Sequence, residues 1–320
     1  MDANVRWPLR ERVATWAPYL LLLLPPLFWS GNVVIGRAVR GTIAPVPLTF
    51  WRWVVAAAIL LPIAANELFR QRNVVRQHWP FLLLLGFLGV FLYQILSYQA
   101  LTATTALNAL LITATAPLSI ALVGWLFFRE GITYSLAAGI ACSLFGVVIV
   151  VTQGNVQSLA ALQINEGDLL MLSAVLVWAF YSNLLKRRPR DLSQLGLLAT
   201  TIVTGMVFAA PAFLWDTLQG DRVMWTPAVL LAILYIGLFA SVLAYVCWNH
   251  GVVQLGANRA GLFINLMPIF GTLLAVLFLG EQPQFYHGVG AALVFGGIVL
   301  ATGWRPWHGK RNGKPAVYRR

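Results

Sequence analysis

Charged side chains are scarce in this sequence. Only 10% of its 320 residues are Asp, Glu, Lys or Arg, whereas 59% are hydrophobic and the mean hydropathy is +0.77. A soluble globular chain carries about 25% charged residues, so this chain has too few polar side chains to cover a surface that faces water. The composition excludes an ordinary soluble domain and indicates a membrane protein.

Cysteine and deeply placed acidic residues are scarce as well. The two cysteines, Cys142 and Cys247, both lie inside apolar segments and are interpreted as small core side chains, not as a disulfide or a metal pair. No Asp or Glu lies deep in an apolar segment, and the chain has no metal-ligand spacing of the HExxH type. We therefore expect no metal, no cofactor and no enzymatic activity, because catalysis needs a nucleophile and base, or metal ligands, that converge on one site.

The net charge of +12 does not indicate a nucleic-acid partner. Lys and Arg lie at the ends of apolar segments and in the tails, and the stretch from Arg305 to Arg320 contains six of them. At these positions basic side chains face anionic lipid headgroups. The expected partners are membrane lipid and a small-molecule substrate.

The chain is rich instead in long apolar runs. Several approach the roughly 20 residues that cross a bilayer as a helix, and they lack the period-two alternation of a membrane barrel. We predict an all-α integral membrane protein with ten transmembrane helices. The predicted spans are approximately 17–37, 47–66, 80–100, 104–128, 132–152, 166–185, 193–214, 227–249, 257–279 and 284–303.

The distribution of Lys and Arg predicts the orientation. With a cytoplasmic N-terminus, the inner segments contain seventeen Lys and Arg, whereas the outer loops contain only Arg37, Arg40 and Arg222. The positive-inside rule then places both termini in the cytoplasm, and we expect a bacterial inner (plasma) membrane. The first apolar run is too long for a signal-peptide core and lacks a small-residue cleavage site, so it is interpreted as the first span.

The sequence also contains an internal repeat. Four special residues recur 151 positions later, as the pairs Pro117 and Pro268, Glu130 and Glu281, Gly139 and Gly290, and Gly146 and Gly297. Five predicted spans per half is an odd number, so the second half must enter the membrane inverted relative to the first. Inverted repeats are typical of secondary transporters, which bind their substrate between the halves near mid-membrane.

The order of these residues carries a family resemblance. The first half has Trp29-Ser30-Gly31-Asn32, Tyr98-Gln99-Ala100-Leu101, Pro117, Glu130, Gly139 and Gly146, and the second half has Trp178, Asn249-His250-Gly251-Val252, Pro268, Glu281, Gly290 and Gly297. As an ordered, duplicated set they resemble the drug/metabolite transporter superfamily, in its ten-span EamA branch. The resemblance implies a cavity lined by the first, third and fourth spans of each half. The second half departs from the pattern at 249–252, where the aromatic residue and Leu are missing.

The resemblance also implies the domain organisation and a function. It divides the chain into a cytoplasmic N-tail (1–16), two EamA-like repeats (17–152 and 153–303) and a basic cytoplasmic C-tail (304–320). The aromatic-rich character resembles bacterial exporters of aromatic and other neutral amino acids. We therefore expect a monomeric secondary transporter that exports small neutral metabolites by alternating access. A carrier for nucleosides, sugars or organic cations is the alternative; a channel or a membrane-embedded enzyme is less favoured, because the sequence shows neither a continuous polar stripe nor a catalytic cluster.

Polar and aromatic side chains inside the spans are the candidate substrate-binding groups. They are Trp29, Asn32, Tyr93, Tyr98, Asn108, Thr115, Trp178, Tyr181, Tyr245, Trp248, Phe263 and Asn265. A pocket with aromatic walls and amide groups suits a neutral, zwitterionic solute with an apolar side chain. Interhelical hydrogen bonds and interfacial aromatic belts are the alternative explanation.

Prolines inside the predicted helices are candidate hinges, and acidic residues at helix ends are candidate turn caps. Pro25, Pro26, Pro117 and Pro268 interrupt predicted helices and are candidate hinges, with packing as the alternative. Glu130 and Glu281 each end a helix, and we expect them to cap the turn by accepting hydrogen bonds from free N–H groups of the next helix. With no deep acid to carry protons, we expect export down the solute gradient, with coupling through a group that the sequence does not identify as the alternative.

Arg52 is the one strong charge well inside a predicted span. An intramembrane arginine is a functional candidate by default. The family resemblance places its span at the periphery, and arginine can extend to the outer headgroups. We therefore predict a structural role for it.

Overall fold

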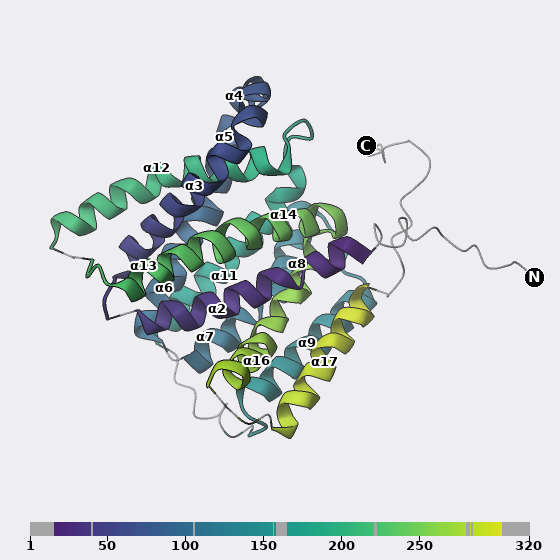
Figure 1. The fold of residues 1–320 in the computed structure, drawn as a ribbon. Helices are drawn as coiled ribbons and strands as arrows, with labels where there is room; N and C mark the ends of the chain where they lie inside the picture. The colour runs from purple at the N-terminus through teal and green to yellow at the C-terminus, as the bar shows by residue number, and fades with distance from the viewer. Residues whose placement is uncertain are drawn as a thin grey trace, which may run out of the picture.

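The computed structural model describes residues 16–39, 41–104, 106–155, 157, 165–220, 223–279, 282 and 284–302, and the regular structure of these residues is helical throughout (Figure 1). Nine helices in this part of the chain are long and apolar enough to cross a membrane. They coincide with nine of the ten predicted spans. The remaining predicted span, 257–279, is also helical but consists of three short consecutive segments, so the protein is an all-α membrane protein.

The helical elements follow one another closely along the chain. In the first half they are α2 (Leu24–Ala38), α3 (Pro45–Arg70), α4 (Arg72–Gln77), α5 (Trp79–Gly86), η1 (Phe87–Leu92), α6 (Tyr93–Ala103), α7 (Ala106–Thr113), α8 (Ala116–Phe128) and α9 (Tyr134–Val151). In the second half they are α11 (Glu166–Leu184), η2 (Leu185–Arg187), α12 (Gln194–Leu218), α13 (Pro227–Tyr235), η3 (Ile236–Leu243), α14 (Ala244–Leu255), α15 (Ala257–Leu262), η4 (Phe263–Leu266), α16 (Met267–Leu279) and α17 (Phe285–Thr302).

Local sequence explains where these helices begin. Thr133, Ser193 and Thr226 cap α9, α12 and α13, and each side chain accepts a hydrogen bond from a backbone N–H three residues on. Prolines occupy the first turn of α3, α5 and α13, where their missing N–H costs nothing. The predicted end of the second span at 66 needs correction: α3 continues to Arg70 and is followed by the short helix α4, because neither glycine nor proline interrupts this stretch.

The backbone irregularities recur in both halves. η1 and η3 are π-helical segments in the third span of each half, and η3 contains every position that lies 151 residues after η1. The fourth span is broken at 114–115, just before Pro117, and its counterpart contains the 3₁₀ segment η4 just before Pro268. The repeat seen in the sequence is therefore a repeat of the structure.

The packing of α9 against α17 shows that the halves are related by a two-fold axis. A Cβ atom on Gly139 would lie 2.6 Å from the Gly297 carbonyl oxygen, and one on Gly146 would lie 2.7 Å from that of Gly290. Gly290 and Gly297 are the repeat counterparts of Gly139 and Gly146, so each half presents the same patch to the other, as at a two-fold interface. In Figure 1 the two helices lie beside each other.

Two hydrogen bonds mark the position of this axis. Cys142 Sγ donates to Leu293 O (3.4 Å), and Gln94 Nε2 donates to Tyr245 OH (3.1 Å). In both pairs the partners are 151 residues apart, so each residue contacts its own counterpart. Such self-paired positions occur only on or near the symmetry axis, and the predicted inverted repeat is confirmed.

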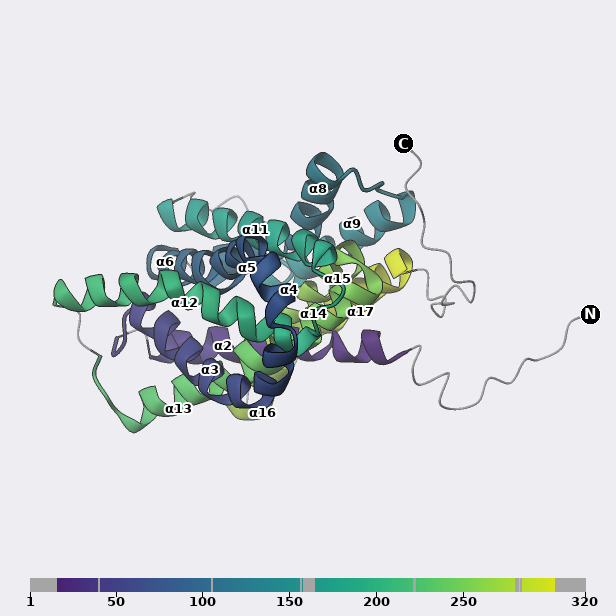
Figure 2. The same ribbon diagram turned by 90° about the horizontal axis from the view of Figure 1, so that it is seen from above.

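The two halves also pack into each other along their other helices. α11 of the second half lies against α6 and α8 of the first, and α12 lies against α3 and α5 (Figure 2). The space between the halves is therefore bordered by elements that are distant in sequence.

Candidate functional site

A cavity of about 110 Å³ lies between the halves. α2, α3, α6 and α7 of the first half form most of its wall, while Met171 of α11 and Met267 of α16 are the second-half residues that border it. Its polar groups come from Asn32, Arg52, Gln94, Ser97, Tyr98, Thr102, Thr104 and Thr113. The first, third and fourth spans of the first half contribute as expected, and α3, the second span, contributes in addition.

Four of the twelve predicted substrate-binding residues line this cavity. They are Trp29, Asn32, Tyr93 and Tyr98. Tyr98 OH donates a hydrogen bond of 2.9 Å to Asn32 Oδ1, and Trp29 Nε1 donates one of 3.1 Å to Ala240 O of the second half. These bonds hold the aromatic and amide groups in place at the boundary between the halves.

Four more predicted residues lie behind Trp29 and do not line the cavity. They are Trp178, Tyr181, Tyr245 and Trp248, each at most 3% exposed. The Trp29 ring lies 5.3 Å from the Trp178 ring and 5.6 Å from the Trp248 ring, between centroids. They form an aromatic cluster that supports Trp29 from the second half.

The last four predicted residues join helices or pack in the core. Asn108 Nδ2 donates to the Asp168 carboxylate (2.9 Å to Oδ2), and Asn265 Nδ2 donates to Ser143 Oγ (2.9 Å). Thr115 Oγ1 donates to Ile112 O (2.6 Å), and Phe263 is 3% exposed. None of the four borders the cavity.

Asp168 is a buried acid that the sequence reasoning overlooked. It stands in the first turn of α11, and its carboxylate accepts hydrogen bonds from Asn108 Nδ2, Thr104 Oγ1 and the Asn165 backbone N–H. Asn165 caps the same helix by accepting from the Asp168 N–H, which completes a capping box. The Asn165-x-x-Asp168 spacing before an apolar run was the available signal.

Arg52 does not reach the headgroups, and the prediction that it could do so is corrected. It is 0% exposed and borders the cavity. Its Nε donates to Ser241 Oγ (2.8 Å), and its Nη1 donates to Gln94 Oε1 (2.8 Å) and Tyr98 OH (2.9 Å). These acceptors, drawn from both halves, keep the guanidinium inside the bundle.

The four predicted hinge prolines all stand in the first turn of a helical segment that follows a break. Pro25 and Pro26 follow the turn at 22–23 before α2, Pro117 follows the break at 114–115, and Pro268 follows η4. The predicted interruptions therefore exist in the backbone, and their hinge role stays a prediction.

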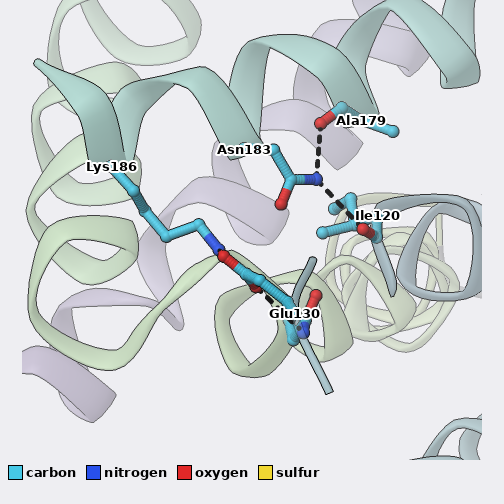
Figure 3. Close-up of polar contacts among 6 residues, drawn as sticks. Ile120, Glu130, Ala179, Asn183 and Lys186 are labelled. Atoms are coloured by element: carbon cyan, nitrogen blue, oxygen red, sulfur yellow. Dashed lines mark hydrogen bonds and ion pairs between the residues drawn. The ribbon is translucent and has the colours of Figure 1, made fainter. Parts of the chain in front are cut away.

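Glu130 connects the halves and does not cap the next helix, which corrects the role predicted for it. Its carboxylate pairs with Lys186 Nζ of η2 (Figure 3). It also accepts a hydrogen bond from Asn258 Nδ2 of α15 (3.3 Å). The acceptor that caps α9 is Thr133, which is nearer to the free N–H groups. Glu281 lies outside the described residues.

Further contacts close the same end of the bundle. Asn183 Nδ2 donates to Ile120 O (3.0 Å) beside the Glu130 pair (Figure 3), and Ser193 bonds to Glu67 and Gln71 of the first half. The cavity lies toward the opposite end, where it is bordered by Ile43 and Pro45 at the start of α3 and by Thr102 near the end of α6. One end of the space between the halves is therefore closed by polar contacts.

Known proteins share this architecture. The model of the EamA-like transporter family matches residues 16–152 and again residues 165–303. The chain is 28% identical to the uncharacterized transporter YyaM of Bacillus subtilis, over 89% of this chain and 93% of that protein. It is 27% identical to an uncharacterized transporter of Archaeoglobus fulgidus, over 89% of this chain and 96% of that protein.

One relative has a more specific name. A protein of Streptantibioticus cattleyicolor, named as a probable terminal-alkyne amino-acid exporter, is 26% identical over 76% of this chain and 80% of its own length. A solved crystal structure, 22% identical, matches with a TM-score of 0.73 over 89% of this chain and 96% of that chain. The structural match supports the fold.

Proposed function

Because this chain belongs to the EamA-like transporter family and is thereby a transporter, we propose that it exports small neutral metabolites, with aromatic or other apolar amino acids as the leading substrates. The observation that carries the proposal is the cavity between the two inverted halves, with an aromatic wall and a set of polar groups. The relative named as an amino-acid exporter supports the same substrate class.

The chemistry of the cavity wall favours an apolar body with polar ends. Trp29, Tyr93, Leu101, Leu110 and Met171 offer apolar surface, whereas Asn32, Gln94 and Tyr98 offer amide and hydroxyl groups. Mixed walls of this kind are typical of sites for small organic ligands. No Asp or Glu is among the described residues that line the cavity, so an organic cation would find no fixed negative charge there.

The predicted orientation assigns a state to the structure. With both termini in the cytoplasm of an inner membrane, the Glu130–Lys186 pair closes the cytoplasmic end and the cavity faces outward. We propose a monomer that exchanges this state for an inward-facing one, as inverted repeats allow. The export is uncoupled in this proposal, and stoichiometric proton antiport in a liposome flux assay would contradict that part of it.

The symmetry predicts which residues line the inward-facing cavity. A Cβ on Gly86 would meet Thr204 and the Thr201 carbonyl, and one on Gly237 would meet Val55 and the Arg52 carbonyl. The second spans, α3 and α12, therefore match at an offset of 149, since these contacts pair Thr201 with Arg52. In the first spans Trp29 and Trp178 are also 149 residues apart. Trp29, Asn32, Gln94, Ser97 and Tyr98 then correspond to Trp178, Tyr181, Tyr245, Trp248 and Asn249.

The contacts of these counterpart residues support the proposal that they line the cavity of the inward-facing state. Tyr181 OH bonds to Asn249 Oδ1 (3.1 Å), which repeats the Tyr98–Asn32 bond with the two residue types exchanged. The Trp178 and Trp248 indole N–H groups and Asn249 Nδ2 are buried without a hydrogen-bond partner. Buried polar groups normally have partners, and water or solute would supply them in an inward-facing state.

Substitution of the aromatic wall tests the transport proposal. In proteoliposomes, Trp29→Ala is expected to raise the half-saturating concentration of labelled phenylalanine about tenfold or more, because truncating an aromatic residue against which the substrate packs removes much of the binding energy. Trp125→Ala is the control, since Trp125 is 55% exposed on α8. Saturable, countertransport-stimulated flux marks a carrier, and ohmic current would identify a channel. A labelled panel of amino acids, nucleosides, sugars and organic cations tests the substrate class. Transport of another class but of no amino acid would overturn it.

Thiol labelling tests the inward-facing route. In a background that lacks Cys142 and Cys247, Asn32→Cys is expected to react with an impermeant maleimide from the outside. Asn249→Cys is expected to react from the cytoplasmic side, on the order of ten to a thousand times more slowly, because a minor state has a population of roughly 0.1–10%. Transported substrate should accelerate the second reaction. Labelling of both sites from the same side would refute the exchange of halves.

A further inference from the structure

Arg52 carries a full positive charge into the interface between the halves. Four of its five N–H groups have acceptors: Ser241 Oγ, Gln94 Oε1, Tyr98 OH, and Ala240 O at 3.3 Å from Nη2. All four acceptors are neutral. The Trp53 ring, 5.2 Å from Cζ, adds an aromatic face but no anion.

No described carboxylate compensates this charge. Among the described residues the ion pair that forms is Lys186–Glu130, at the closed end of the bundle, and Asp168 is bonded to Asn108, Thr104 and Asn165. Arginine does not lose its proton in proteins, and a buried charge without a counter-ion is costly. The protein thus maintains an unneutralised cation on the wall of its cavity.

Packing between the halves does not require this cation. The counterpart of Arg52 in the second half is Thr201, which is 1% exposed and donates to Leu198 O of its own helix. The same place in the fold is therefore filled by a small neutral side chain. A charge confined to one half points to a role in the cavity that this half lines.

We propose that Arg52 binds the carboxylate of the transported solute. This rests on the proposed transport function and adds the chemical group that the site recognises. The planar guanidinium matches a carboxylate in two parallel hydrogen bonds. Arg52 is covered by Tyr98 and Gln94, so the carboxylate replaces the Tyr98 hydroxyl at Nη1 and also uses the free N–H of Nη2. The bond to the neutral Tyr98 hydroxyl has a charged donor only, whereas a carboxylate adds the opposite charge and a second parallel hydrogen bond, which favours the replacement.

The bound solute then spans two kinds of surface. Its carboxylate lies at Arg52, and its apolar part lies against Trp29, Tyr93 and Met171, which line the same cavity. The substrate class is an organic carboxylate with an apolar body, of which an apolar amino acid is one example. Amides and esters of the same solutes are expected to bind weakly.

The test compares L-phenylalanine, 3-phenylpropionate and L-phenylalaninamide as inhibitors of counterflow. Wild-type protein is expected to prefer the two carboxylates over the amide by about tenfold or more, the usual magnitude for a hydrogen bond to a charged group. Arg52→Gln should abolish the preference by weakening the acids while leaving the amide unchanged. Arg52→Lys keeps the charge but lacks the planar guanidinium, so it should retain part of the preference for carboxylates. Arg76→Gln removes an exposed charge on α4 and is the matched control.

A binding measurement separates this proposal from the transport proposal. Thermal stabilisation of the detergent-solubilised protein by 3-phenylpropionate that is lost in Arg52→Gln supports the carboxylate site, even if the wild-type protein transports no amino acid. In that case only the proposed amino-acid substrate is refuted. An unchanged acid-to-amide ratio in folded Arg52→Gln would overturn the site while transport stands. Should that variant not fold, an acid-to-amide ratio in Arg52→Lys equal to that of the wild type overturns the site as well.

Discussion

Gly297→Ala is expected to destabilise the protein, whereas Gly296→Ala, one residue earlier in α17, is expected to leave it as stable or to stabilise it. A Cβ at position 297 would lie 2.6 Å from the Gly139 carbonyl oxygen and 2.8 Å from Ser143 Cβ, while at position 296 it would meet nothing within 4 Å. The close atoms belong to the backbone and Cβ of α9, so no side chain can rotate away. The two helices would have to separate.

The expected magnitudes have opposite signs. Overpacking costs about 1–3 kcal/mol, and separation of α9 from α17 also disturbs the symmetric contact at Gly146 and Gly290. Ala in place of an unconstrained helical Gly gains up to about 1 kcal/mol. Thermal unfolding in detergent measures both variants under one condition. Because the interface is two-fold, Gly146→Ala, at the repeat counterpart of Gly297, should behave like Gly297→Ala: its Cβ would lie 2.7 Å from the Gly290 carbonyl oxygen and 2.8 Å from Leu293 Cβ. Equal stabilities of the 296 and 297 variants would contradict the helix contact.

The fold could be predicted from the sequence because the features that define it, the apolar runs and the repeated residues, recur along the chain. Apolar runs of bilayer length locate the spans, and the constant offset between Pro117 and Pro268 or between Gly139 and Gly290 locates the repeat. The structure adds that the offset falls to 149 in the second spans, α3 and α12, and the same offset separates Trp29 from Trp178 in the first spans. This is why Trp29 and Trp178 are true counterparts although they do not lie 151 residues apart.

The lining of the cavity could be predicted only where the size and polarity of a single side chain decided its position. Trp29 and Tyr98 are large amphipathic side chains deep in spans, and they line the cavity. The role of Arg52 depends on Gln94 and Ser241, which are 42 and 189 residues away, and no local pattern reports such contacts. Glu130 illustrates the same limit: its helix-end position predicted a cap, but Lys186 and Asn258 approach it from the other half.

The division of predicted residues between the cavity and the aromatic cluster has a physical reason. Hydrophobicity and helical face are the same for both halves, so they cannot distinguish the half that is open from the half that is closed. Trp178 and Trp248 therefore looked equivalent to Trp29 in the sequence, although only Trp29 lines the cavity of this state. The conformation of the halves decides which set is exposed.

Asp168→Ala is expected to cost the folded protein about 2–4 kcal/mol, because buried groups that lose a partner cost about 1–3 kcal/mol each. The carboxylate is 7% exposed and accepts from Asn108 Nδ2 at 3.0 and 2.9 Å and from the Asn165 N–H at 3.0 Å, besides Thr104. Its removal takes the acceptor away from α6, α7 and the start of α11 together. It also breaks the capping box that begins α11.

Glu166→Ala is the matched control for this prediction. Glu166 stands in the same first helical turn but is exposed, so its loss removes the favourable charge at the helix N-terminus, about 0.3–1 kcal/mol, and no buried bond. Asp168→Asn keeps an oxygen acceptor for the Asn165 N–H and should fall between the two variants. Thermal unfolding ranks the three, and equal stabilities of the alanine variants would refute the buried network.

Transport measurements extend the same comparison to the cavity. Thr104, which bonds to the Asp168 carboxylate, also borders the cavity, and Met171 lies one helical turn beyond Asp168 on α11. Loss of the carboxylate should therefore lower the rate of phenylalanine flux in the folded fraction of Asp168→Ala, while Glu166→Ala keeps the wild-type rate. Because α6, α7 and α11 come from both halves, this network joins the halves at the open end as Glu130 and Lys186 join them at the closed end. If folded Asp168→Ala transported at the wild-type rate, the network would be a structural clamp that does not control the shape of the cavity.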